Sequence, residues 1–310
     1  MAVQTKTIQS STGAALHAYV READRSPPRA VIQINHGLAE HAARYGRFQE
    51  ALAAVGFASI AHDHRGHGHT TAADAQARVY AYENGVDKVL ADIASVHDFA
   101  QNRWLDAPIV TFGHSAGGLM AINFACHAPE ASAGLAVWNS NASGGLAGRA
   151  AQAILAAEAR LKGPGAASAI IPKLTFDAWN KKLAPNRTDF DWLSRDEAEV
   201  DAYIADPLCG WPASISMWRD IFELIYSAGS ARNLSKLPAT LPVHLLGGEA
   251  DPATDGARAT RAMAGKLAHI GCRNVSLNIL PNTRHESLNE VNRDETMAAF
   301  IAWLDGIIAA

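Results

Sequence analysis

The chain has 310 residues, of which 48% are hydrophobic and 19% are charged, and its formal net charge is −4 at pH 7. This is the composition of a globular protein that is long enough to bury a large core. It lacks the basic excess of nucleic-acid-binding proteins, so no nucleic-acid partner is expected. The negative balance also offers no general attraction to anionic membranes.

The cysteines and the N-terminal residues indicate a cytoplasmic protein. Cys126, Cys209 and Cys272 are widely spaced and form no C-x-x-C pair, so neither a zinc site nor a redox dithiol is expected. The first residues lack the apolar segment of a signal peptide, and no stretch approaches the ~18 apolar residues of a membrane helix. We therefore expect three neutral thiols in a reducing compartment.

Strand-like and helix-like segments alternate through the first 138 residues. Residues 3–21 predict an opening β-hairpin. Apolar runs predict buried strands at 30–35, 57–61, 109–112 and 134–138. Apolar residues at helical spacing predict helices over 43–55, 85–103 and 118–126. This alternation implies an α/β fold with a mostly parallel sheet that helices cover on both faces.

The alternation stops between residues 141 and 235, where aromatic-rich pieces surround an Ala-rich amphipathic helix predicted over 149–161. It then resumes with a strand at 242–246, a helix at 256–269, a strand at 274–280 and a closing helix at 292–308. We interpret residues 141–235 as a cap, inserted into one α/β core that consists of residues 1–140 and 236–310.

A serine nucleophile is indicated by Gly113-His114-Ser115-Ala116-Gly117, which stands between a predicted strand and a predicted helix. This is the setting of a nucleophile elbow, a turn so tight that small residues must flank the serine. The hydroxyl of Ser115 then projects from the tip of the turn. The backbone N–H of Ala116, the next residue, faces an incoming carbonyl and is the first predicted oxyanion donor.

A nucleophilic serine needs a base, and the base needs an orienting acid. In chains with this elbow the order is Ser, then Asp or Glu, then His. Asp251 and His285 each follow a predicted strand, at the end where open α/β sheets place their sites. Glu249 is the alternative acid, and His269 is the weaker alternative base because it falls at a helix end. Asp255 is expected to cap the following helix.

The second oxyanion donor is predicted in the loop after the strand at 30–35. Gly37 permits a sharp turn there, so the backbone N–H of Leu38 is our choice. His36 is expected to support this loop through hydrogen bonds rather than to act in catalysis.

The histidine-rich segment from His62 to His69 lacks the spacing of the known zinc motifs. We expect a structural loop in which Asp63 pairs with Arg65 and the glycines allow close packing, without a metal ion.

Five segments together resemble the monoacylglycerol lipase and lysophospholipase branch of the α/β-hydrolases, which is also described as serine aminopeptidase S33-like. The segments are His36 to Tyr45, Asp63 to Gly68, Gly113 to Gly118, Asp206 to Leu208, and Arg284 to Glu286. The likeness runs from about residue 30 to the C terminus, and the combination is more specific than any single motif. It implies an α/β-hydrolase fold with an eight-stranded sheet and an inserted helical cap.

The resemblance also implies hydrolysis of acyl esters without a cofactor or metal. It assigns Ser115 as nucleophile, Asp251 as acid, His285 as base, and Leu38 and Ala116 as oxyanion donors. The implied substrates are small acyl esters, either monoacylglycerol- or lysophospholipid-like or of short-to-medium chain length, and a transient contact with a lipid surface is compatible with them. Two alternatives stay open: a small-substrate peptidase or amidase of the S33 type, and a non-catalytic ligand receptor of the same fold.

The resemblance is weakest in the cap, outside Asp206 to Leu208. Thr70 and Ala253 also depart from the branch, which usually has serine and a β-branched residue at these positions, but neither is a predicted triad residue. The cap holds seven aromatic residues that are candidates for an acyl pocket: Trp179, Trp192, Trp211, Trp218, Phe176, Phe190 and Phe222. Taken singly, each is expected to seat the cap on the core. The head group, the acyl length and the oligomeric state are not determined by the sequence.

Overall fold

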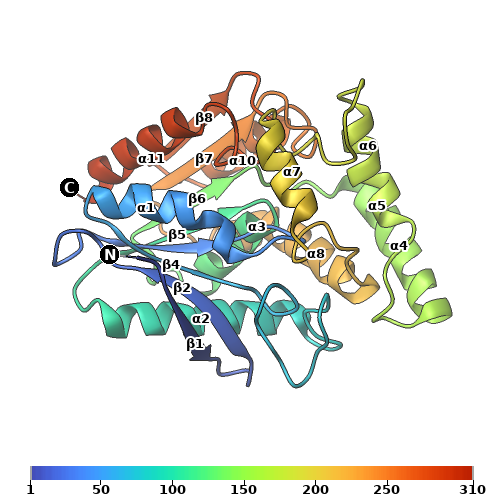
Figure 1. Ribbon diagram of the computed structural model, residues 1–310, viewed down its shortest axis with the longest axis horizontal. Coiled ribbons are helices and arrows are strands. Elements are labelled where there is room, and N and C mark those ends of the chain that lie inside the picture. The colour runs from blue at the N-terminus through green and yellow to red at the C-terminus, as the bar shows by residue number, and fades with distance from the viewer. Residues whose placement is uncertain (1, 309–310) are drawn as a thin grey trace.

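The computed structural model describes residues 2–308 as a central sheet with helices on both faces and further helices at one end (Figure 1). The sheet has eight strands in the order β1-β2-β4-β3-β5-β6-β7-β8. They are β1 (Gln4–Gln9), β2 (Ala15–Arg21), β3 (Val31–Asn35), β4 (Ala58–His62), β5 (Ile109–His114), β6 (Gly134–Trp138), β7 (Val243–Gly248) and β8 (Val275–Leu280).

Strand β2 pairs antiparallel with β1 and with β4, and all the other neighbouring strands are parallel. The predicted hairpin and the mostly parallel eight-stranded sheet are therefore confirmed. Every residue of β3, β4, β5, β6 and β7 is buried. Burial of both faces is what continuous apolar runs predict for a parallel sheet that helices cover on each side.

Two layers of helices cover the sheet, as Figure 1 shows. Helices α1 (Gly46–Ala54), which follows the 3₁₀ helix η1 (Ala42–Tyr45), and α11 (Arg293–Ile308) pack on one face through Phe48 and Phe300. Helices α2 (Gly85–Arg103), α3 (Ala116–His127) and α10 (Arg258–His269) pack on the other face through residues such as Ile93, Leu119 and Met263.

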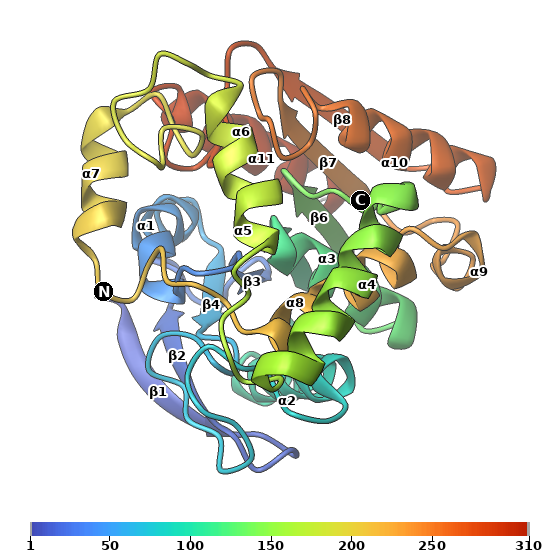
Figure 2. The ribbon, with the colours of Figure 1, turned by 90° about the vertical axis from the view of Figure 1, so that its right-hand side faces the viewer.

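The connection between β6 and β7 forms the helices at the end of the sheet. They are α4 (Gly145–Lys162), α5 (Ile171–Leu174), α6 (Phe176–Lys181), α7 (Glu197–Ala205), α8 (Ile215–Ala228) and α9 (Ala231–Leu234). Figure 2 shows α4, α5 and α6 in front of the sheet when this end faces the viewer. Helix α8 shares one apolar core with α2 and α3 through Trp218, Ile221 and Leu224, so this region packs tightly on the rest of the chain. The cap limits at residues 141 and 235 stay a prediction.

The expected helix cap at Asp255 is wrong. Helix α10 begins after Ala257, which has no side chain that could cap it. Asp255, Gly256 and Ala257 all have left-handed φ angles of 58°, 66° and 62°, so the chain coils before the helix starts. The carboxylate of Asp255 instead forms ion pairs with Arg258 and, at 3.6 Å, with Lys182.

Within residues 2–308, no helix combines the length and the apolar character that a membrane span requires.

Candidate active site

Ser115 lies in a tight turn between β5 and α3. Its φ and ψ angles are 53° and −119°, a strained backbone conformation that tends to occur at functional sites. A Cβ atom on Gly113 would lie 2.2 Å from the carbonyl oxygen of Gly117, and one on Gly117 would lie 2.1 Å from that of Asn35. Both glycines are therefore required by close backbone contacts, as an elbow demands.

The structure brings Ser115, His285 and Asp251 together from three separate loops. The Nε2 atom of His285 lies 2.9 Å from Oγ of Ser115, and its Nδ1 atom lies 3.0 and 3.1 Å from the two carboxylate oxygens of Asp251. An ionised carboxylate only accepts hydrogen bonds, so Nδ1 carries the proton and Nε2 is free to accept from the serine. This is the geometry of a nucleophile, its base and the acid that orients the base.

Asp251 is fully buried, and four donors surround its carboxylate. Besides His285, they are the side chains of Asn139 (3.1 Å) and Thr254 (2.9 Å) and the backbone N–H of Ala253 (2.9 Å). Burial alone would raise the pKa of Asp251, but the electrostatic interaction with the imidazole of His285 and these hydrogen bonds lower it below its ordinary value. Asp251 is therefore held ionised.

Asn139 and Thr254 did not emerge from the sequence as site residues. Asn139 comes directly after β6, just as Asp251 follows β7. This position at the carboxyl end of a strand could have identified Asn139 as a site residue from the sequence. Neither alternative residue is part of the site: Glu249 and His269 are exposed and do not line the cavity above Ser115.

The two predicted oxyanion donors lie on either side of Ser115. Leu38 and Ala116 both line the same cavity as the serine, and among the described residues neither backbone N–H donates a hydrogen bond. The expected role of Gly37 needs correction, because the left-handed residue of this turn is Ala39, with φ 57°. Gly37 is needed for space: a Cβ there would lie 2.8 Å from Oε1 of Glu40.

Buried charges behind the oxyanion loop connect it to the loop of His285. Glu40 accepts a hydrogen bond of 2.6 Å from the backbone N–H of Gly37 and one of 2.7 Å from Arg44. Arg44 also binds both carboxylate oxygens of Glu286, the residue after His285. Burial would raise the pKa of Glu40, but His114 and Arg44 hold it well below its usual range. The sequence analysis did not predict this network, although its residues lie in the segments His36 to Tyr45 and Arg284 to Glu286 that carry the family resemblance.

The expected pair of Asp63 and Arg65 is wrong. The carboxylate of Asp63 accepts backbone hydrogen bonds of 2.8 Å from Ala42 and from His69, while Arg65 pairs with Asp92 of α2 at 2.7 Å. The loop folds around Asp63 so closely that a Cβ on Gly68 would lie 2.1 Å from its Oδ2. The tight packing expected at the glycines is thus confirmed, but the two charged side chains point to different partners.

Several histidines of this region are buried and uncharged. His36 accepts a hydrogen bond of 3.0 Å from the backbone N–H of His64, which confirms its expected supporting role. Burial lowers the pKa of His36 to about 3, that of His62 to about 4 and that of His67 to about 3. At neutral pH these rings pack as neutral groups.

A cavity of about 720 Å³ opens above Ser115, between the core and the cap. All seven aromatic cap residues named above line it. From the sequence, each of them taken singly was expected only to seat the cap on the core. Trp192 is also buried, and its ring lies 4.9 Å from that of His285, so one aromatic residue both seats the cap and shields the imidazole of His285.

The cap is also bonded to the loop that carries His285. The backbone N–H of Glu286 donates to the carbonyl oxygen of Leu193 at 2.8 Å. The guanidinium of Arg284 donates to the carbonyl oxygens of Asp191 (2.6 Å) and Ser194 (2.9 Å). The cap segment 191–194 is thus bonded to the residues on both sides of His285 in the sequence.

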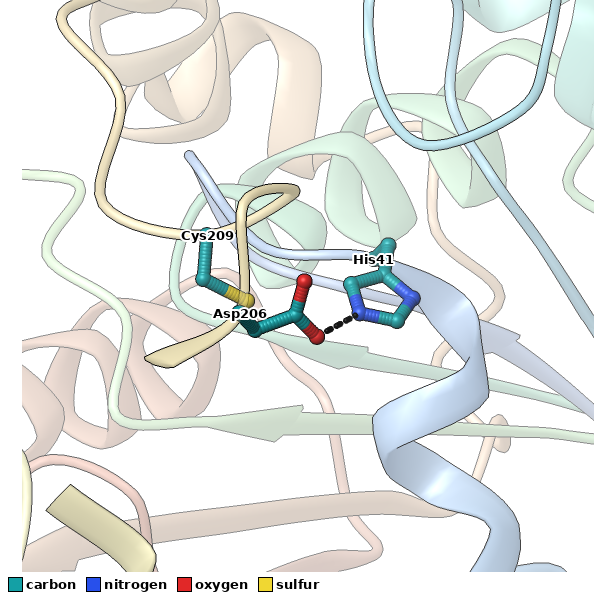
Figure 3. A group of neighbouring side chains, drawn as sticks. All are labelled: His41, Asp206 and Cys209. Atoms are coloured by element: carbon teal, nitrogen blue, oxygen red, sulfur yellow. Dashed lines mark hydrogen bonds and ion pairs between the residues drawn. The ribbon is translucent and has the colours of Figure 1, made fainter. Parts of the chain in front are cut away.

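A second contact joins the cap to the oxyanion loop, where His41, Asp206 and Cys209 meet (Figure 3). The Nε2 atom of His41 lies 2.8 Å from Oδ2 of Asp206. Burial raises the pKa of the Cys209 thiol, so it stays neutral. The residue types are those of metal ligands, but a direct hydrogen bond beside a neutral thiol accounts for the arrangement, and we assign no ion to it.

Comparison with known proteins places this site in a wider context. A family model described as serine aminopeptidase, S33, matches residues 26–292. Monoglyceride lipase from Mus musculus is 28% identical over 272 residues, which cover 86% of this chain and 82% of that protein. Monoacylglycerol lipase from Mycolicibacterium smegmatis is 26% identical over 286 residues, with 89% and 88% covered.

Solved structures agree with the sheet topology described above. A thermostable carboxyl esterase from Bacillus coagulans superposes with a TM-score of 0.90 at 24% identity, with 99% of both chains covered. A structure described as a lipase in its open form superposes with a TM-score of 0.86 at 28% identity, with 100% of both chains covered. The predicted α/β-hydrolase fold is confirmed.

Proposed function

The chain belongs to the serine aminopeptidase S33 family of α/β-hydrolases and is a carboxylic ester hydrolase, and we propose that it cleaves esters through an acyl-enzyme on Ser115. One observation carries the assignment of residues. The hydrogen-bonded series Ser115 Oγ, His285 Nε2, His285 Nδ1 and Asp251 lies at the base of an aromatic-lined cavity.

In the first half of the proposed reaction, Oγ of Ser115 attacks the ester carbonyl while Nε2 of His285 takes its proton. The negative oxygen that forms is bound by the backbone N–H groups of Leu38 and Ala116, which have no other partner among the described residues. Asp251 stabilises the positive charge on the imidazole. When the intermediate collapses, His285 returns the proton to the leaving alcohol.

In the second half, water enters the place of the alcohol. His285 removes a proton from the water as it attacks the acyl carbonyl, and the same two N–H groups bind the second oxyanion. Collapse of this intermediate breaks the bond to Oγ, which regains its proton from His285. The carboxylic acid is released, and neither half of the reaction calls for a redox or group-transfer cofactor.

The cavity supports small uncharged acyl esters, monoacylglycerols included, as the substrate class. Most of the residues that line it are apolar, aliphatic as well as aromatic, so binding is driven by burial of the acyl chain. Two of the relatives above are named for the hydrolysis of monoacylglycerols. We assign the acyl pocket to a cap formed by residues 141–235.

The cap also offers a surface for a transient contact with lipid. Three leucines of α4 and α5 are highly exposed: Leu146 by 89%, Leu161 by 83% and Leu174 by 57%. Leu146 and Leu161 lie at the two ends of α4 and Leu174 at the end of α5, so the cap presents apolar side chains at three separate points. We propose that they touch the aggregated substrate when it is insoluble.

A labelling experiment combined with a substrate panel tests the proposal. We expect a fluorophosphonate to label the protein and the Ser115→Ala variant to remain unlabelled, with its circular dichroism unchanged. Nitrophenyl esters should be hydrolysed much faster than amino-acid anilides. Ester hydrolysis at full rate by Ser115→Ala would refute the assigned nucleophile, and faster cleavage of anilides would favour an amidase.

A further inference from the structure

The carbonyl oxygen of Ala39 accepts two hydrogen bonds, and both come from the cap. The phenol of Tyr203 donates to it at 2.9 Å, and the backbone N–H of Gly210 also donates at 2.9 Å. Ala39 directly follows Leu38 and has a left-handed φ of 57°. A residue with a side chain keeps such a conformation only when its surroundings hold it there. The cap therefore supplies both hydrogen bonds to the carbonyl of the strained residue.

The core holds the other side of Leu38. The backbone N–H of Gly37 donates to Oε1 of Glu40 at 2.6 Å. Leu38 thus stands between two fixed backbone groups, the N–H of Gly37 and the carbonyl of Ala39. The peptide unit that carries the N–H of Leu38 is held directly as well, because Nδ1 of His36 lies 2.7 Å from the carbonyl oxygen of Gly37. The hydrogen bonds to Ala39 restrain the following residue of the same turn, and through it the angle at which the Leu38 N–H enters the cavity.

The same cap segment makes two further contacts with this loop. Asp206 binds His41 at 2.8 Å (Figure 3), and the ring of Tyr203 lies 4.9 Å below the guanidinium of Arg44. Tyr203 is buried, and burial raises its pKa, so the phenol keeps its proton and remains a donor at neutral pH. Residues 203–210 therefore contact the oxyanion loop at three places.

We propose that Tyr203, a residue of the cap, is a positioning residue for the oxyanion hole. Through the carbonyl of Ala39, its phenol directs the N–H of Leu38 toward the oxygen that becomes negative in the transition state. This inference rests on the proposed function. The residue itself does not touch the reacting atoms. An oxyanion donor affects kcat only when it is directed at the position of the developing charge, so a small rotation of Leu38 is enough to slow the reaction.

The test replaces a single hydroxyl. Tyr203→Phe removes the hydrogen bond to Ala39 and keeps the aromatic ring over Arg44. Tyr226→Phe is the matched control, since it removes another phenol in the same region, one that donates to the carbonyl of Gly145 at 2.8 Å. For each protein we would measure kcat and KM on a nitrophenyl butyrate ester, and Ki for a trifluoromethyl ketone, which binds serine hydrolases as an oxyanion.

For Tyr203→Phe we expect kcat to fall about fivefold and KM to stay unchanged. A fivefold loss corresponds to the net contribution of one hydrogen bond. Ki for the ketone should rise by the same factor, because inhibitor and transition state share the negative oxygen. Tyr226→Phe should leave all three values unchanged. A purely structural role for Tyr203 would lower thermal stability without this parallel between kcat and Ki.

The inference is overturned if kcat and Ki of Tyr203→Phe match those of Tyr226→Phe, or if KM alone rises. If Tyr203→Phe does not accumulate as a folded protein, Asp206→Asn replaces it, with the same parallel fall of kcat and rise of Ki expected on a smaller scale. A wild-type protein that hydrolyses no ester would instead refute the proposed function, which is a different result from equal rates in the two variants.

Discussion

Arg44 binds both carboxylate oxygens of Glu286, through hydrogen bonds of 2.7 and 2.6 Å, although 242 positions separate the two residues in the chain. A single guanidinium thereby joins the loop after β3 to the loop that carries His285. The same side chain binds Glu40 at 2.7 Å. Arg44 therefore helps to set the position of the His285 loop relative to the loop of Leu38, together with His114, which lies 3.3 Å from Glu40 and 3.0 Å from the carbonyl oxygen of His285.

Arg44→Lys should therefore damage the enzyme, although it keeps the charge. A lysine ammonium cannot hold two carboxylates in the paired geometry of a guanidinium, so one buried carboxylate loses its partner. Loss of a partner in a buried ion pair costs about 3–5 kcal/mol. We expect the free energy of unfolding, measured in urea, to fall by about that amount or somewhat less, and kcat to fall with it.

The control for this variant is Arg47→Lys. Arg47 forms an ion pair with Glu199 in which its own side chain is 46% exposed, and such pairs contribute about 0–1 kcal/mol. Equal stability of the two variants would contradict the role assigned to Arg44.

Asp251→Asn should lower kcat by a factor on the order of 10⁴, by analogy with serine triads in general, because the amide favours the wrong tautomer of His285. Asn139→Ala removes one of the donors to Asp251 and should cost roughly tenfold. Glu249→Gln and Asp255→Asn should have small effects on kcat, since both side chains lie outside the triad. A large loss in Asp255→Asn and none in Asp251→Asn would show that the acid is misplaced.

The free energy of unfolding should decrease as the pH is lowered, over a range set by the buried histidines. The pKa values of His36, His62 and His67 are lowered to about 3, 4 and 3 from the model-peptide value of 6.5. Below about pH 6.5 these three histidines therefore bind protons in the unfolded chain but remain neutral in the folded chain. The free energy of unfolding should then decrease as pH falls, by about 1.4 kcal/mol per pH unit for each histidine.

Urea unfolding at several pH values between about 6.5 and 5 measures this slope. His62→Phe is the matched variant, because both ring nitrogens of His62 are buried without a hydrogen-bond partner. It should reduce the slope by about 1.4 kcal/mol per pH unit. An unchanged slope would mean that His62 is charged in the folded protein or exposed by partial unfolding.

Activity should depend on acyl length until the cavity is filled. Each buried CH₂ group contributes about 0.8 kcal/mol, or roughly a fourfold gain in kcat/KM. The gain should stop at the chain length that fills the cavity of about 720 Å³ above Ser115. Phe176→Ala removes a ring that lines the cavity and should move the maximum to longer chains. Tyr82→Ala, at an exposed residue outside the cavity, should leave the maximum in place. A flat dependence on length would show that the cap forms no acyl pocket.

The core elements and the three residues that form the hydrogen-bonded triad followed from the sequence because their signals are local. Ser115 is marked by its flanking glycines, and Asp251 and His285 by the strands that precede them. The mostly parallel sheet followed from the alternation of strands and helices. Such signals need only the neighbours along the chain.

The rest depends on contacts that no local pattern encodes. The closeness of Asp63 and Arg65 in sequence suggested a pair, yet the tight loop directs the two side chains to different partners. The partners of Arg44 and Ala39 lie in distant segments, in Glu286 and Tyr203, so their contacts arise only when the cap and the core are folded together. Residue type alone could not select these partners among the charged and aromatic residues of the chain.

The bonds from Arg284 and Glu286 to cap residues 191–194 bear on protein engineering. Cap exchange is an obvious route to new substrate preferences, since residues of the cap line the cavity above Ser115. The acceptors are backbone carbonyl oxygens, so a foreign cap whose backbone takes a different path here would leave the guanidinium of Arg284 and the N–H of Glu286 without partners. A chimaera of this kind should retain activity only if the loop around residue 285 and the oxyanion loop are transplanted together with the cap.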